Sequence, residues 1–275
     1  MSAFLHLISI ITALVLTLYI KPRLIETLYK KNMIVTNYSG RDVINGAGLI
    51  FFIPCMLSAL TLWKLIGLDN IFIYIILLLS MTLIGYIDDS LETSTSKGFK
   101  GHIKSMMSGE LSTGIIKLIV SVIIGTLISA VYYSNVIDIA LNTILFCLCV
   151  NFINLLDLRP GRGIKGFILF TLFISVSSGL RSIWILLPIY SSLTIYTRGE
   201  MEEIYMLGDT GANLLGGVLG FYILKAAYPG VKYALFIILI FLHIIAEFKS
   251  LSNIIDSIPL LKYMDSFGQL KKERS

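Results

Sequence analysis

The chain has 275 residues, of which 56% are hydrophobic and only 14% are charged, and its net charge at pH 7 is +5. Together with a mean hydropathy of +0.85, this composition excludes an ordinary soluble domain and is typical of polytopic membrane proteins. The basic residues are spread over separate short loops rather than gathered on one surface, so we expect no nucleic-acid partner.

Apolar stretches close to the roughly 17 to 25 residues that cross a bilayer predict about nine transmembrane helices in an all-α bundle. In chain order they are Ser2–Ile20, Asn45–Leu65, Ile71–Ile87, Thr113–Tyr133, Val136–Leu156, Ile164–Ser178, Ser182–Tyr196, Thr210–Ala227 and Val231–Glu247. The sixth and seventh stretches are short. We find no internal repeat and no low-complexity linker, which favours a single integral-membrane domain over residues 1–275.

The loop charges predict an orientation for these helices. Most lysines and arginines follow the first, third, fifth, seventh and ninth stretches, whereas the opposite turns carry only Lys64, Arg181, Lys225 and Lys232. Because cytoplasmic loops of membrane proteins are enriched in lysine and arginine, we expect the N-terminus outside and the C-terminus in the cytoplasm.

Three polar clusters interrupt the apolar sequence, each where a predicted helix meets the cytoplasmic side. Gly85–Asp89 ends the third stretch, Asn151–Asp157 ends the fifth, and Met206–Gly211 leads into the eighth. Ionisable groups at membrane depth cost a few kcal/mol each even on lenient insertion scales, so they indicate a polar cavity or a bound cation.

Two of the clusters allow a geometric expectation. Asn151, Asn154 and Asp157 recur every third residue and span roughly 120° of one helix face, so all three can face one cavity. Asp209 directly precedes a helix, where we expect it to cap the N-terminus, and the backbone amides beyond it are of the kind that bind phosphate.

These groups together favour a metal site. Four carboxylates and two carboxamides opening on one cleft suit Mg²⁺, with Mn²⁺ as the alternative, because Mg²⁺ takes oxygen ligands and keeps positions for substrate phosphates. The expected chemistry is metal-assisted phosphoryl transfer, with the Lys97–Lys104 loop supplying cations for a diphosphate. Each cluster also has a purely structural explanation. Asp88-Asp89 could be a solvated pair at a helix end, the asparagine face an interhelical contact, Gly208–Gly211 a capped turn, and the lysine loop an orientation signal. The occurrence of three clusters in order, each at the inner end of an apolar helix, argues for a shared site.

With Asn45-Gly46-Ala47-Gly48 before the second helix, the ordered set resembles the polyprenyl-phosphate N-acetylhexosamine-1-phosphate transferase superfamily over about Asn45 to Gly220. The resemblance implies transfer of a sugar 1-phosphate from a UDP-sugar, of the UDP-N-acetylhexosamine class, to a polyprenyl phosphate, with release of UMP. It further implies cell-envelope glycan synthesis at the cytoplasmic face of a bacterial plasma membrane.

The resemblance also implies residue roles. Asp209 and Asp88 would bind the metal, and Asp88 and Asp89 would act as catalytic residues at the lipid phosphate. Substrate-binding positions carried over from the family's motifs or lying beside them are Asn151, Asn154, Asp157, Lys97 and Lys104.

Departures from the family pattern leave alternatives open. Glu92 stands where the family often has a lysine, and the histidine-rich inner loop near the end is missing. After Asp157 the chain loses a carboxylate and gains Arg159 and Arg162, whose guanidiniums suit bidentate phosphate binding. We therefore expect a donor smaller than a muramoyl-pentapeptide nucleotide. A transporter or lipid-binding protein, an inactive relative and a homodimer stay open as alternatives.

Overall fold

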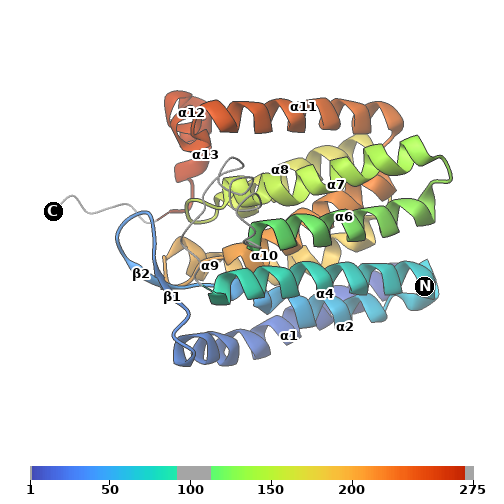
Figure 1. The fold of residues 1–275 in the computed structure, drawn as a ribbon. Helices are drawn as coiled ribbons and strands as arrows, with labels where there is room; N and C mark the ends of the chain where they lie inside the picture. The colour runs from blue at the N-terminus through green and yellow to red at the C-terminus, as the bar shows by residue number, and fades with distance from the viewer. Residues whose placement is uncertain (1, 92–112, 270–275) are drawn as a thin grey trace.

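A computed structural model describes residues 2–91 and 113–269, which form twelve α-helices, two short 3-10 helices and one antiparallel pair of strands (Figure 1). The all-α class predicted from the composition is confirmed, apart from this small hairpin. The predicted diphosphate-binding lysines Lys97 and Lys104, and Glu92, lie outside the described residues.

The elements follow one another with short connections. Their bounds are α1 Ser2–Lys30, β1 Ile34–Thr36, β2 Asp42–Ile44, η1 Ala47–Phe51, α2 Phe52–Leu60, α3 Trp63–Ile66, α4 Leu68–Leu91, α6 Thr113–Tyr132, α7 Val136–Leu156, α8 Arg162–Ser177, η2 Ile183–Ile185, α9 Leu187–Met201, α10 Gly208–Ala226, α11 Pro229–Phe248, α12 Leu251–Ser257 and α13 Pro259–Ser266. In the hairpin, Val35 of β1 pairs with Val43 of β2.

Within the described residues, five helices are long and apolar enough to cross a membrane: α1 from Ala3 onward, α4, α6, α7 and α11. These helices indicate a multi-pass membrane protein. The predicted second span, Asn45–Leu65, is not one helix but η1, α2 and α3 in succession. The helix is interrupted where the backbone N–H groups of Thr61 and Leu62 bond to the carbonyls three residues back, and its first residues, Ala47 and Gly48, donate to the carbonyls of Met206 and Leu207.

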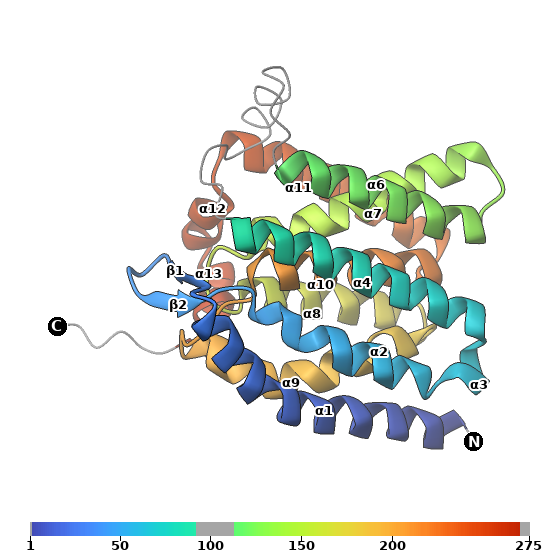
Figure 2. The ribbon, with the colours of Figure 1, turned by 60° about the horizontal axis from the view of Figure 1, so that its bottom comes forward.

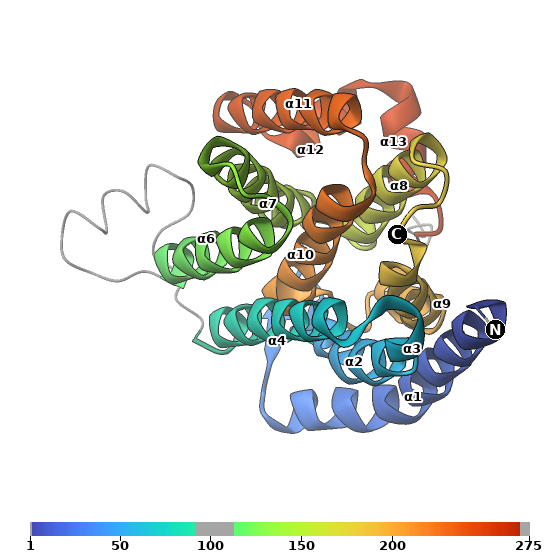
Figure 3. The ribbon, with the colours of Figure 1, turned by 90° about the vertical axis from the view of Figure 1, so that its right-hand side faces the viewer.

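Helix α10 forms the centre of the bundle and is buried along nearly its whole length. It packs against α4, α7, α8 and η1, and α4, α7 and α8 lie around it in Figure 3. Glycines allow this close packing, since a side chain at Gly216 would lie 2.5 Å from the Cα atom of Val150 in α7. A helix enclosed by protein can carry polar residues along its length without exposing them to lipid.

The outer helices leave apolar side chains on the surface. Helix α11 packs against α7, but Ile237 and Phe241 on its other side are 66% and 62% exposed. Such a surface suits contact with lipid. The start of α10, the end of α7, the β-hairpin and helices α12 and α13 all lie at one end of the bundle (Figures 1 and 2).

Candidate active site

The first and third polar clusters meet at the start of α10 because glycines remove the side chains that would separate them. A Cβ atom on Gly85 of α4 would lie 2.3 Å from the carbonyl oxygen of Asp209. A Cβ atom on Gly48 would lie 2.1 Å from the Cα atom of Gly211. The Asn45–Gly48 and Gly85–Asp89 segments therefore both pack backbone to backbone against Leu207–Gly211, although Gly48 and Gly211 are 163 positions apart in the sequence.

Asp89 caps α10 from the neighbouring helix. One of its carboxylate oxygens accepts hydrogen bonds from the backbone N–H of Asp209 and the side-chain amide of Asn45, both at 3.0 Å. The other accepts from the backbone N–H of Thr210 at 2.9 Å and from its hydroxyl at 2.6 Å. Four donors thus converge on a single carboxylate, which satisfies N–H groups that a helix start leaves free.

This arrangement corrects the predicted capping role of Asp209. Gly208 begins α10, so Asp209 lies in its first helical turn rather than before it. Its carboxylate is free to point elsewhere because Asp89 supplies the cap. The adjacent aspartates of α4 thus have different surroundings: Asp89 stabilises α10, whereas Asp88 faces a lysine.

That lysine is Lys117 of α6, a residue that our sequence reasoning missed. Its Nζ atom lies 3.4 Å from a carboxylate oxygen of Asp88 and donates a hydrogen bond to Asp209. The side chains of Lys117 and Asp88 are each 17% exposed, whereas that of Asp209 is 37% exposed, so the group is open to solvent on the Asp209 side. The signal that could have found Lys117 is its position as the single charged residue of an otherwise apolar helix of 20 residues.

The donor set fits a hard divalent cation in part. Within residues 2–91 and 113–269 no three His, Cys, Asp or Glu side chains are grouped as metal ligands. Asp88 and Asp209 nevertheless converge on one positive charge, that of Lys117. Two carboxylates with water and substrate phosphate completing the shell are a common arrangement for Mg²⁺, so Asp88 and Asp209 are the residues that would hold it.

The amide-rich cluster is divided rather than facing one cavity. Asn151 is exposed on α7, whereas the amide of Asn154 donates to the Oδ1 atom of Asn213 in α10 at 2.7 Å. Asp157 lies past the last helical residue with ψ at 45°, so the rotation of 100° per residue no longer applies to it. The sequence did not indicate Asn213, which is fully buried and whose own Nδ2 has no hydrogen-bond partner among the described residues.

Asp157 turns toward the start of α10 and has an acidic environment. Burial raises the pKa of its carboxyl well above the usual range, and the nearby charges of Glu200, Asp209 and Asp89 raise it further. Its side chain packs beside Gly163, where a Cβ atom would lie 3.3 Å from Oδ1. Asp157 is therefore the member of the second cluster that lies near the Asp88–Lys117–Asp209 group.

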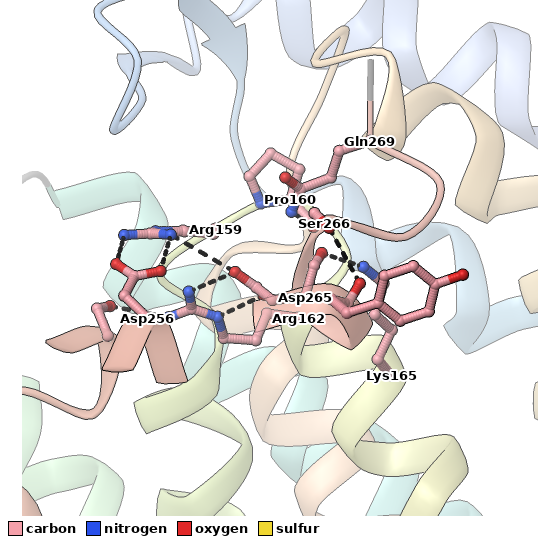
Figure 4. Close-up of polar contacts among 10 residues, drawn as sticks. Arg159, Pro160, Arg162, Lys165, Asp256, Asp265, Ser266 and Gln269 are labelled. Carbon is pink, nitrogen blue, oxygen red and sulfur yellow. Dashed lines mark hydrogen bonds and ion pairs between the residues drawn. The ribbon is translucent and has the colours of Figure 1, made fainter. Parts of the chain in front are cut away.

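Arg159 and Arg162, expected to bind a diphosphate, have carboxylate partners instead. Arg159 forms two hydrogen bonds with Asp256, at 3.0 and 2.7 Å, and Arg162 forms two with Asp265, at 2.8 and 2.7 Å (Figure 4). Asp256 and Asp265 belong to α12 and α13, two short helices that we did not predict. Each nitrogen of Arg162 donates one hydrogen bond to protein, which uses three of its five N–H groups, and the side chain is only 4% exposed.

A cavity of about 310 Å³ opens beside Asp89. It is lined by residues from the end of α1, the first strand and the end of α4, including Lys31, Asn45, Tyr86 and Ser90. Lys31 contributes an ammonium group that donates to the Tyr86 hydroxyl at 3.1 Å. The cavity is thus polar, carries a cation and adjoins the candidate site, which suits the phosphate of a substrate.

Comparison with known proteins adds no family to this description. No protein-family model matches the chain, and no curated protein matches it.

Proposed function

We propose that this chain is a Mg²⁺-dependent phosphoglycosyl transferase, related to the polyprenyl-phosphate N-acetylhexosamine-1-phosphate transferases. It transfers a sugar 1-phosphate from a UDP-sugar, most simply a UDP-N-acetylhexosamine, to a polyprenyl phosphate. The products are UMP and a lipid-linked diphosphate sugar used in cell-envelope glycan synthesis.

The observation that carries the proposal is the convergence of Asp88, Lys117 and Asp209 from three different helices. Phosphoryl transfer needs little covalent chemistry from the protein, because positioning and charge stabilisation supply most of the catalysis. Two carboxylates and a largely buried ammonium at the end of a lipid-facing bundle provide both negative ligands and a positive charge. Such a site can contact a water-soluble diphosphate and the phosphate of a membrane lipid together.

The chain's residues have separate tasks in this reaction. An oxygen of the lipid phosphate attacks the β-phosphorus of the donor, the bond from that phosphorus to the bridging oxygen breaks, and UMP leaves. Asp88 accepts the proton of the lipid phosphate if it carries one, and Lys117 offsets negative charge on the transferred group. Asp89 keeps the start of α10 in place, and Asn154 and Asp157 orient the uridine diphosphate. When bound, the metal ion spreads the charge of the leaving phosphate.

The proposal includes the membrane arrangement. About nine segments cross a bacterial plasma membrane, with the N-terminus outside and the site on the cytoplasmic face, where nucleotide sugars are made. The asymmetric distribution of loop lysines and arginines supports this orientation. Helix α10, which is more polar than the five long helices, is then enclosed by protein, whereas α8 presents exposed Leu172 and Phe173 to the lipid.

The test is UMP release by the purified protein with Mg²⁺, a polyprenyl phosphate and a panel of UDP-sugars. We expect turnover with a UDP-hexosamine, and at least a hundredfold less with Asp209→Asn, whose neutral amide is a poor ligand for a hard cation. Asp69→Asn, at an exposed position near the start of α4, is the matched control and should retain full activity. Near-normal turnover by Asp209→Asn would show that the proposed metal site is wrong.

A further inference from the structure

The C-terminal helices contact the α7–α8 turn through charged groups on both sides (Figure 4). Besides the two paired contacts from Arg159 and Arg162, Lys165 donates to the backbone carbonyl of Asp265. In the opposite direction, the side-chain amide of Gln269 donates to the carbonyl of Pro160 at 3.2 Å. The tail thus bonds to three of the six residues from Asp157 to Arg162, and to Lys165 one helical turn further on.

Charge rather than apolar burial holds this tail in place. In α12 and α13 the buried side chains are Leu251 and Asp265, whereas Leu260 and Tyr263 are each 67% exposed. Helices of seven and eight residues are too short to be stable by themselves in water. The position of the tail therefore depends on its ion pairs with the turn, and the turn depends on them in return.

The two ion pairs differ in exposure. The side chains of Arg162 and Asp265 are 4% and 7% exposed, while those of Arg159 and Asp256 are 27% and 37% exposed. Both arginines use the forked face of the guanidinium, which fixes direction as well as distance. The buried Arg162–Asp265 pair anchors the tail. The more exposed Arg159–Asp256 pair fixes the orientation of Arg159, two residues after Asp157.

The turn is also supported from inside the bundle. The backbone N–H of Gly161 donates to the Oε1 atom of Glu200 in α9 at 2.7 Å. Glu200 itself is 1% exposed and cannot move far in a packed interior. A turn held by α9 on one side and by the tail on the other has little freedom, so Asp157 at its start has little freedom too.

We propose that α12 and α13 form a clamp in which Asp256 and Asp265 are positioning residues for Asp157. The clamp sets the donor-binding half of the site without contacting the donor, and it fixes this turn by ion pairs between distant parts of the chain. The positioning of a donor rests on the proposed transferase function, whereas the clamping of the turn does not.

The first test needs no activity. Hydrogen–deuterium exchange is measured over residues 157–165 of the full-length protein in nanodiscs, for the wild type, Asp256→Asn and Asp265→Asn. We expect roughly tenfold faster exchange in both variants, because loss of a pair makes local opening easier. Asp69→Asn is the control and should exchange like the wild type. Unchanged exchange in Asp256→Asn, whose partly exposed pair leaves the fold intact, would overturn the clamp.

The second test uses kinetics to separate positioning from general damage. Asp256→Asn should raise KM for the UDP-sugar roughly tenfold and leave KM for the lipid phosphate unchanged, and the reversed pair Arg159→Asp with Asp256→Arg should restore much of the loss. An equal rise in both KM values, or no change in either, would overturn the positioning role. Absence of UMP release by the wild type would overturn the proposed function, while the exchange experiment still decides the clamp.

Discussion

At the start of α10, Asp89 accepts four hydrogen bonds, two of them from backbone N–H groups, and glycines let three segments touch backbone to backbone. At the α7–α8 turn, the contacts join charged side chains, and Arg159 and Arg162 reach carboxylates of a separate pair of helices. Both regions lie at the same end of the bundle. One is built from small residues and main chain, the other from long side chains and charge.

This difference predicts how each region responds to change. A backbone-directed cap tolerates few substitutions, because every lost acceptor leaves a buried N–H without a partner. Both residues of a forked ion pair can be replaced together by apolar residues of similar volume, because apolar side chains need no hydrogen-bond partner. A single substitution of the Asp89 cap should therefore destabilise the start of α10. In the clamp, one substitution in an ion pair should be destabilising, and replacement of both partners should restore most of the stability.

The largest effect is expected from Asp89→Ala. Removal of this carboxylate leaves the donors of Asp209, Thr210 and Asn45 unsatisfied, and at about 1–3 kcal/mol per group the loss of stability should be about 5 kcal/mol. Equilibrium unfolding in mixed micelles measures it. Asp88→Ala is the neighbouring control, and it should cost about 1 kcal/mol or less, because its partner Lys117 keeps its contact with Asp209. Equal destabilisation by the two variants would remove the distinction between a capping and a site-facing aspartate.

A double-mutant cycle tests the second region. Arg162→Met alone should cost about 4 kcal/mol, because it removes both hydrogen bonds to the buried Asp265 carboxylate and leaves it only the Arg159 guanidinium, 3.5 Å away. The double variant Arg162→Met with Asp265→Leu should cost about 1 to 2 kcal/mol, since both charges are gone. The same unfolding assay gives the coupling between the two residues. If the double variant is as unstable as the sum of the single ones, the pair does not act as a unit.

The same comparison explains which parts of the fold could be predicted from the sequence. The bounds of α4, α6, α7 and α11, to within four residues, and the position of Gly85–Asp89 and Leu207–Gly211 at helix ends could be predicted, because apolar length and small-residue motifs are local signals. Asn45–Leu65 was wrong as one helix, because η1, α2 and α3 follow one another there and its first residues bond to Met206 and Leu207 far along the chain. A hydrophobic run cannot indicate such a long-range pairing.

The site residues likewise divide into those that local sequence signals predict and those whose partners lie far along the chain. Asp88 and Asp209 lie together as predicted, but Lys117, the single charged residue of an otherwise apolar helix, completes their group. The partners of Arg159 and Arg162 could not be predicted, because Asp256 and Asp265 are 97 and 103 residues away in an ordinary polar tail. Guanidiniums bind carboxylates and phosphates with one geometry, so chemistry alone could not choose between them.

The smallest effect concerns the inner support of the turn, and it depends on pH. Burial raises the pKa of Glu200 from 4.5 to about 7, so the folded protein holds a proton on this group that the unfolded chain has released. Stability should therefore fall as the pH rises from about 4.5 to 7 and then level off, by about 3 kcal/mol in all. Glu200→Gln keeps an acceptor for the Gly161 N–H but cannot ionise, so its stability should lack this component. The two proteins should agree within error at pH 4.5, which is the internal control, and diverge with the variant more stable at pH 8. Parallel unfolding curves over this range would show that Glu200 is not the group that titrates, and that the turn is held from inside by an ionised carboxylate, as it is held from outside by the clamp.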